Sequence, residues 1–187
     1  MQKEKSKLPI NSQNFEKKIS SIISKKEIKK ASSLLEEYID SGNIIQNKNL
    51  LKFILEPSGM TVAHLLAHNS VNFSDPEILK LKGIDRSQEN AIFGHNGVSV
   101  AFILAKKGFF FEDREIQLLG SEENRATVAH AMANNGYIFK NPDILRLRDS
   151  KGNTVAHVMA NNGHNFESPE ILNLENNFGF TVKDFQD

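Results

Sequence analysis

The sequence predicts an all-α protein, an α-solenoid of stacked helix-turn-helix repeats, and three observations support this fold class. The tetrapeptide Thr-Val-Ala-His starts at positions 61, 127 and 154, and degenerate copies start at 99 and 181. Apolar residues follow each tetrapeptide at the spacing of one helix face. A glycine follows three of the copies and a proline follows three, at fixed distances, where they end one helix and begin the next.

The repeat extends well beyond the tetrapeptide. Its five copies are 38, 28, 27 and 27 positions apart, counted between their first residues. In four of them an alanine follows three positions after the His or Phe, and a phenylalanine follows nine positions after it. A period of this length indicates a repeat protein, in which no unit buries its apolar face alone and the units must stack.

Each unit predicts two short helices. In the unit that starts at 154, Val155 and Ala156 belong to an inward stripe of small residues, and Gly163 ends the first helix with a positive φ. Ser168 supplies an N-cap oxygen to the second helix, and Pro169 occupies its first position, where the missing N–H costs nothing. The same pair begins the second helix in two other units, as Asp75-Pro76 and Asn141-Pro142.

Composition and pattern divide the chain into three parts. Residues 1 to 12 predict a flexible basic tail. Residues 13 to 56 predict an N-terminal helical capping unit, whose Lys- and Glu-rich face suits the polar outer surface of a terminal repeat. Residues 57 to 187 hold about four repeats with an insertion at 82 to 98, and the segment from Thr181 to Asp187 is predicted to close the far end as half a unit.

The run from Gly152 to His164, Gly-Asn-Thr-Val-Ala-His-Val-Met-Ala-Asn-Asn-Gly-His, resembles the first helix of an ankyrin repeat. The family signature reads Gly, any, Thr, Pro, Leu, His, any, any, Ala, any, any, Gly, His. Here Val-Ala replaces Pro-Leu, and the period is about 27 instead of 33, so the second helix and its loop must be shorter. The resemblance covers residues 40 to 187 and implies a binding scaffold without catalytic activity.

The resemblance also implies where a partner binds. Ankyrin partners lie against the tips of the inter-repeat turns and the exposed end of each first helix. The resemblance implies that the partner is another protein, and we expect the chain to be a monomer. Asn amides offer donors and acceptors without net charge, so this surface can recognise a polar partner. The implied residues at the helix ends are His68, Asn69, Lys106, Lys107, Asn134, Asn135, Asn161 and Asn162, and those near the tips are Arg125, Lys151 and Asn153.

Two further places are candidate partner contacts. Phe109, Phe110 and Phe111 are consecutive, and three neighbouring aromatic residues cannot all point inward from one short segment. We therefore assign Phe110 as an exposed anchor. The insertion at 82 to 98 contains Arg86 and His95. Insertions in solenoids form loops on one face, often the binding face, and a tolerated surface loop is the alternative.

The recurring histidines, His64, His130 and His157, are interpreted as structural. Packed helices lie about 8 to 10 Å apart, so histidines in successive units cannot share one zinc ion at about 2 Å from each. The resemblance implies that the Thr and His of each unit hydrogen-bond to each other and to backbone. His64 and His68 have the spacing of a metalloprotease pair but lack the glutamate between them. We predict no metal, no cofactor and no catalytic residue.

Composition limits the remaining function classes. Lys and Arg balance Asp and Glu at 23 each, which weakens the case for a dedicated nucleic-acid binder. The chain has no cysteine, which excludes disulfides and thiolate chemistry. No apolar run reaches membrane-spanning length. We therefore expect no membrane partner and a cytoplasmic location, with secretion through another signal left open.

Two alternative functions stay open. Residues 1 to 30 hold nine Lys and three Glu, a side-chain charge of about +6, and this basic arm is typical of a segment that associates with nucleic acid. The other alternative is an unrecognised enzyme with a site near the loop at 82 to 98, in which His95 is the residue to substitute first.

Overall fold

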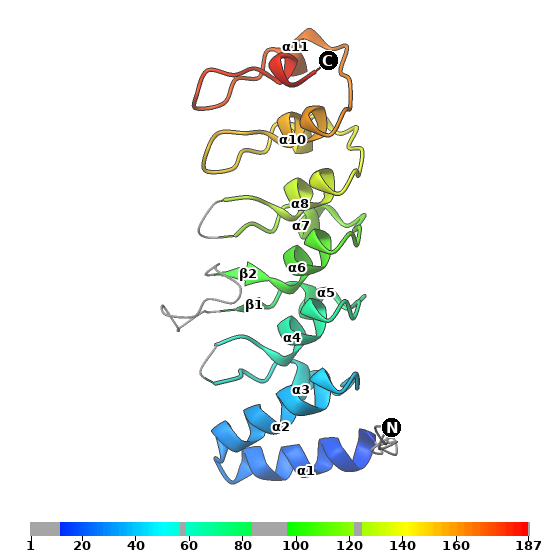
Figure 1. Cartoon of the computed structure of the whole chain (residues 1–187), viewed down its shortest axis with the longest axis vertical. Coiled ribbons are helices and arrows are strands. Elements are labelled where there is room, and N and C mark those ends of the chain that lie inside the picture. Colours follow the sequence, from blue (N-terminus) through cyan, green and yellow to red (C-terminus); the bar gives the residue numbers. More distant parts are fainter. Residues whose placement is uncertain (1–11, 57–58, 84–96, 122–124, 187) are drawn as a thin grey trace, which may run out of the picture.

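The computed structural model describes residues 12–56, 59–83, 97–121 and 125–186. These residues are mostly helical and contain one two-stranded sheet, which confirms the all-α class. Successive helices lie above one another in an elongated stack, with the N-terminal helices at one end and the C-terminal helices at the other (Figure 1). Within the described ranges, no helix is both long enough and apolar enough to cross a membrane.

The N-terminal end of the stack is a pair of longer helices, α1 (Ser12–Ser24) and α2 (Ile28–Asp40). They lie antiparallel and pack against each other (Figure 1). The ring of Phe15 stacks on that of Tyr38 with centroids 3.7 Å apart, and Ile19 and Leu35 are fully buried. Helix α2 packs against the first helix of the next layer, so the pair covers the apolar side of the first repeat layer. The other face of the pair is polar, as a terminal layer requires.

A seven-residue first helix follows in each of four successive layers. These helices are α4 (Val62–His68), α6 (Val100–Lys106), α8 (Val128–Asn134) and α10 (Val155–Asn161), and the 3-10 helix η1 (Val182–Phe185) takes their place in the last layer. Each packs on the one before it, from α2 through to η1. Alanines recur at two buried positions of each first helix, such as Ala129 and Ala133 in α8, and their small size lets neighbouring helices approach closely.

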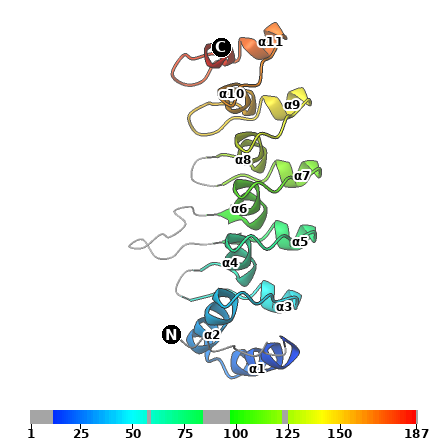
Figure 2. The same cartoon turned by 45° about the vertical axis from the view of Figure 1, so that its right-hand side comes forward.

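A four-residue second helix follows α2 and each of the four seven-residue first helices. These are α3 (Lys48–Leu51), α5 (Pro76–Leu79), α7 (Arg114–Gln117), α9 (Pro142–Leu145) and α11 (Pro169–Leu172), and they form a column beside the first helices (Figure 2). Two of the three predicted N-caps form, because the side chains of Asp75 and Asn141 accept hydrogen bonds from the N–H of Glu77 and Asp143, at 3.0 and 2.9 Å. The cap predicted at Ser168 is wrong, because its side chain accepts no capping hydrogen bond. Helices this short are not stable alone, so their stability depends on stacking.

The segment that joins the first helix of a layer to its second helix is called the connector. It begins with a residue in the left-handed region, as the sequence predicts for Gly136 and Gly163, whose φ values are 85° and 82°. In the layer of α4 the same place is taken by Ser70, with φ 62°. The connectors line the edge of the stack opposite the turns between layers (Figure 1).

The segments that join successive layers are β-hairpins, and they all project from one side of the stack, which is called the hairpin side (Figure 2). The residue three positions after a second helix pairs with the N-cap residue of the next first helix, as Arg148 does with Thr154. Pairing extends to two residues in β1 (Lys82–Gly83) and β2 (Val98–Ser99). The sequence did not predict these strands, because pairs this short show no alternation. The predicted insertion lies in this hairpin, and its residues 84–96 lie outside the described ranges.

Candidate partner-binding surface

A row of buried threonine and histidine side chains joins successive layers behind the hairpin side. In the layer of α8, Thr127 Oγ1 lies 2.8 Å from His130 Nδ1, and His130 Nε2 lies 3.3 Å from the carbonyl oxygen of Asn153 in the next layer. The same arrangement joins Thr154 and His157 to Phe180, and Thr61 and His64 to Val98. The Thr–His contacts that the resemblance implied are present, and each also reaches the backbone of the following layer.

These histidine rings are neutral donors and acceptors. The backbone N–H groups of Thr127 and Thr154 donate to Nδ1 of His130 and His157, at 3.2 and 3.1 Å, so the proton resides on Nε2, which donates to the next layer. Burial lowers the pKa of all three rings from the ordinary histidine value. In the part of the chain that the structure describes, no group of three or more His, Asp or Glu side chains could hold a metal ion.

Two layers depart from this pattern. Phe102 replaces the histidine in the layer of α6 and is buried. In the last layer Asp184 takes the position, and its carboxylate accepts hydrogen bonds from the N–H and Oγ1 of Thr181, at 2.7 and 2.8 Å. Asp184 therefore contacts Thr181 within its own layer, as histidine does in three other layers. Its carboxylate has no N–H group with which to donate a hydrogen bond to a further layer. These backbone and hydroxyl bonds lower the pKa of Asp184.

Several residues predicted to bind a partner are used to hold the layers together. The side-chain amide of Asn135 donates to Ala105 O at 2.9 Å, and that of Asn162 donates to Ala133 O at 3.0 Å. Each amide therefore satisfies a carbonyl at the end of the preceding first helix. Asn69 donates within its own helix, to Leu65 O at 3.2 Å. The sequence did not predict this structural use of the asparagine column.

The neighbouring positions at the helix ends face solvent. Lys106, Asn134 and Asn161 are exposed, as is Lys107 one residue further on. His68 is half-buried, and its pKa is lowered to about 4, first because burial disfavours the imidazolium and then because of the positive charges of Lys107 and Lys106. His68 is therefore uncharged at neutral pH, and the positive charge at the ends of α4 and α6 comes from Lys106 and Lys107.

The predicted residues near the hairpin tips differ in role. Asn153 is structural, because its N–H donates to Asp149 Oδ1 at 2.8 Å and its Oδ1 accepts from Asn176 at 2.8 Å. Lys151 and Arg125 are exposed, and Arg125 has a left-handed φ of 55°. Arg86 and His95, and with them the enzyme hypothesis, fall outside the described residues.

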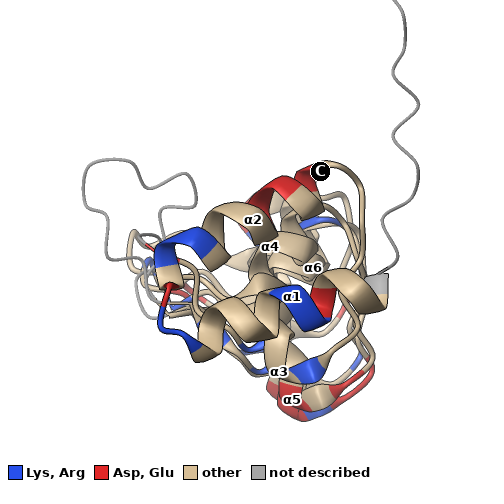
Figure 3. Ribbon diagram, turned by 90° about the horizontal axis from the view of Figure 1, so that it is seen from below, with Lys and Arg blue, Asp and Glu red and all other residues tan. Residues whose placement is uncertain are grey.

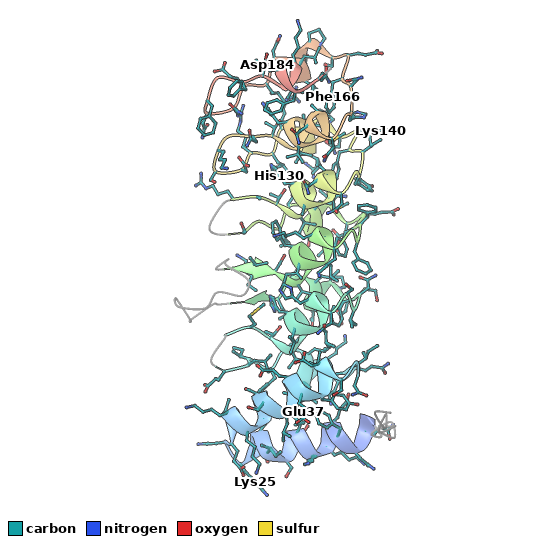
Figure 4. The ribbon with its side chains drawn as sticks, viewed as in Figure 1. Lys25, Glu37, His130, Lys140, Phe166 and Asp184 are labelled. Carbon is teal, nitrogen blue, oxygen red and sulfur yellow. The ribbon has the colours of Figure 1, made fainter. Side chains whose placement is uncertain are left out.

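The hairpins and the first helices border an open hollow of about 260 Å³ in the middle of the stack. Helices α6, α8 and α10 all contribute to it, and the hairpins add Ala126 and Asp149. Figure 4 shows His130 on this side and Lys140 at the opposite edge. The lining residues are Phe102, Lys106, Ala126, His130, Ala131, Asn134, Asn135, Asp149 and Val158. The sequence predicted three of these as partner contacts, Lys106, Asn134 and Asn135, but gave no sign of Asp149 or Val158.

A second set of inter-layer contacts runs along the second helices. Lys52 pairs with Glu77, Arg114 with Asp143 and Arg146 with Glu170, each with nitrogen and oxygen 3.0 Å apart, and Lys80 pairs with Glu115 at 2.5 Å. All of these side chains are exposed. Basic and acidic residues accordingly lie side by side at the second helices near α3 and α5 (Figure 3), so this column carries little net charge.

A comparison of the sequence with models of known protein families gives no match, and a comparison with curated proteins gives none either. The function therefore has to be argued from the surface itself.

Proposed function

We propose that this chain is a protein-binding scaffold, an α-solenoid of short ankyrin-like repeats without catalytic activity, that grips its partner along the hairpin side. One observation carries the proposal: the hollow between hairpins and first helices is lined from three successive layers. Repeat proteins use surfaces that span several layers to bind extended or folded partners.

The lining of the hollow has the mixed chemistry of a protein interface. Phe102, Ala131 and Val158 provide apolar surface, while Lys106 and Asn134 are exposed at its edge and are not used in hydrogen bonds or ion pairs within the described residues. Asp149 adds an acceptor from the hairpin. An apolar centre with polar groups at the rim is the usual arrangement of such interfaces.

The buried histidines support a structural interpretation over a catalytic one. His130 and His157 use both ring nitrogens in bonds to the Thr of their own layer and to backbone of the next. A ring held in this way has no free nitrogen with which to exchange a proton with a substrate.

The proposal is tested with a double variant, Asn134→Arg in the hollow and Asn161→Arg at the equivalent helix end of the next layer, which adds bulk and charge at exposed positions. The matched control is Asn72→Arg with Asn165→Arg, because both of these asparagines are exposed on connectors. Each protein is used for affinity capture from the source cell, and the main captured protein is then purified and titrated. We expect the control to keep the wild-type Kd and the hollow variant to bind at least about tenfold more weakly.

Equal binding by the two double variants would contradict the proposal. We expect both double variants to fold, because none of the four asparagine side chains makes a hydrogen bond in the described part of the chain. Thermal unfolding of both variants checks this.

A second candidate function is association with nucleic acid at the N-terminal end. Exposed lysines lie in α1, in α2 and in the turn between them, at Lys17, Lys18, Lys25, Lys26 and Lys29. Among the described lysines of these two helices, Lys30 has an acidic partner, Glu27, at 2.8 Å. Basic residues gather at the turn between α1 and α2, and acidic residues lie at the far end of α2 (Figure 3).

Titration of DNA and RNA at several salt concentrations tests this candidate. Phosphate contacts give a steep fall of affinity with salt, and substitution of Lys25, Lys26 and Lys29 by Gln would reduce that slope. A flat salt response would remove nucleic acid from consideration.

A further inference from the structure

The connector edge carries an apolar patch that is confined to two layers. Phe110 and Ile138 occupy equivalent positions in successive connectors and are 50% and 55% exposed. Tyr137 lies between them, with its ring centroid 5.2 Å from that of Phe110. At the same position in the layers on either side the residues are Asn72 and Asn165. The asparagines show that this position does not need an apolar side chain for folding.

Two hollows flank the residues at the centre of this patch. Tyr137 and Ile138 line both of them. The hollow towards the C-terminus also includes Met159 and His164, and the other includes Gln117, Lys140 and Ile144. Tyr137 and Ile138 therefore form a ridge, and large side chains of a bound segment have a recess on each side of it.

The patch is flanked by lysines that lack acidic partners. Lys107 precedes Phe110 by three residues and Lys140 follows Ile138 by two, and both are exposed. Within the described residues neither forms an ion pair, whereas the nearby Arg114 pairs with Asp143 at 3.0 Å. The one acidic residue that lines the flanking hollows is Glu112. Because Arg114 and Asp143 cancel, Lys107, Lys140 and Glu112 together leave a net charge of about +1 beside the patch.

We propose that the connector edge at Phe110, Tyr137 and Ile138 binds an acidic protein segment that carries large apolar side chains. The apolar side chains enter the two recesses beside the ridge, and the carboxylates lie against Lys107 and Lys140. This site is separate from the hollow on the hairpin side, so either site can fail its test without affecting the other.

The chemistry favours a peptide over a nucleic acid. A single strand needs cations spaced along its backbone together with flat aromatic faces for its bases. Here Ile138 and Met159 are aliphatic, and the two lysines described beside the patch, Lys107 and Lys140, are too few to follow a phosphate backbone. An acidic segment with Leu or Phe residues matches both the recesses and the charge.

The test uses a short fluorescent peptide in which Glu, Leu and Phe are separated by Ser, titrated into the full chain by fluorescence polarisation. One control peptide has Lys in place of Glu, and another has Ser in place of Leu and Phe. We expect the acidic apolar peptide to bind at least about tenfold more tightly than either control peptide, and its Kd to rise with salt.

Two pairs of variants locate the binding. Phe110→Asn with Ile138→Asn introduces the residue that neighbouring layers have at this position, and its control is Phe178→Asn, which changes another exposed phenylalanine. Lys107→Glu with Lys140→Glu reverses the flanking charge, and its control is Lys151→Glu with Lys183→Glu. We expect about tenfold weaker peptide binding for each patch variant and an unchanged Kd for each control.

Three outcomes would overturn the inference: no preference for the acidic apolar peptide, equal loss in patch and control variants, or tighter binding of a single-stranded oligonucleotide that depends on the same residues. If Phe110→Asn with Ile138→Asn lowers the unfolding temperature, the lysine pair decides the question, because neither Lys107 nor Lys140 has a side-chain partner in the described structure.

Discussion

The inner and outer sides of the stack join successive layers by different chemistry. Inside, His157 is 2% exposed and connects Thr154 to the carbonyl oxygen of Phe180 in the next layer, at 3.1 Å. Outside, Arg146 reaches Glu170 of the next layer at 3.0 Å, but the glutamate side chain is 80% exposed. Buried hydrogen bonds are costly to break because their partners are left unsatisfied, whereas exposed ion pairs exchange with water. We infer that the inner contacts fix the stack and the outer ones mainly adjust its surface charge.

The largest effect is expected when a buried histidine is removed. His157→Ala leaves Thr154 and the Phe180 carbonyl without their partner and creates a cavity, so the free energy of unfolding should fall by about 3 kcal/mol. Urea denaturation of the full chain measures this. His164→Ala, at a half-buried ring whose nitrogens make no hydrogen bond in the described part, is the control and should cost well under about 1 kcal/mol. Similar losses in both variants would contradict the role assigned to the inner contacts.

The next effect concerns the place where two hairpins pack. Gly152 has φ 76°, and a Cβ atom there would lie 2.7 Å from the backbone nitrogen of Asn177. Gly152→Ala combines this clash with the cost of a left-handed alanine, and it should destabilise the chain by about 2 kcal/mol. Gly163→Ala is the control, because it has a similar φ of 82° but open space around its Cβ position. It should cost about 1 kcal/mol, and the difference between the two values measures the hairpin packing.

The pH dependence of the free energy of unfolding reports on the half-buried His68. The folded-state pKa of His68 is about 4, below the ordinary 6.5, so the unfolded chain binds more protons between these values. The contribution of this group is complete above pH 6.5 and is lost as the pH falls towards about 4. His68→Asn introduces the residue that α8 and α10 have at the equivalent position, Asn134 and Asn161. It should reduce the slope of the free energy of unfolding against pH in this range. The same slope in both proteins, measured by urea denaturation, would contradict this assignment.

The smallest effect is expected for the outer ion pairs. Arg146→Ala removes an exposed contact to Glu170 and should change the free energy of unfolding by about 0.5 kcal/mol or less. The difference from wild type should vanish at high salt, because screening weakens exposed pairs. A loss as large as that of His157→Ala would show that the outer column, and not the inner one, holds the layers together.

The sequence predicts local features of the fold well and non-local ones poorly. The caps at Asp75 and Asn141 and the left-handed Gly163 are confirmed, because each depends on residues close by in the chain. The pairing of β1 with β2 was missed because it joins residues at the two ends of the predicted insertion, far apart in the sequence. Helix propensity and periodicity carry no information about such a contact.

The candidate surface shows the same limit at the level of single residues. Asn134 and Asn135 are identical neighbours, and both were predicted to bind a partner. The structure leaves Asn134 exposed and uses the amide of Asn135 to satisfy Ala105 O of the preceding layer. This difference depends on where the earlier helix ends in space. Phe110 was predicted as an exposed anchor from its two aromatic neighbours, and its exposure of 50% agrees with that expectation.

Site-specific photo-crosslinking tests the central claim most directly. A photoreactive amino acid is placed at Asn134 in the hollow or at Asn72 on a connector, and each protein is irradiated with the partner obtained by affinity capture. We expect a crosslinked partner from Asn134 and none from Asn72. Crosslinking from Asn72 without any from Asn134 would contradict a binding surface on the hairpin side.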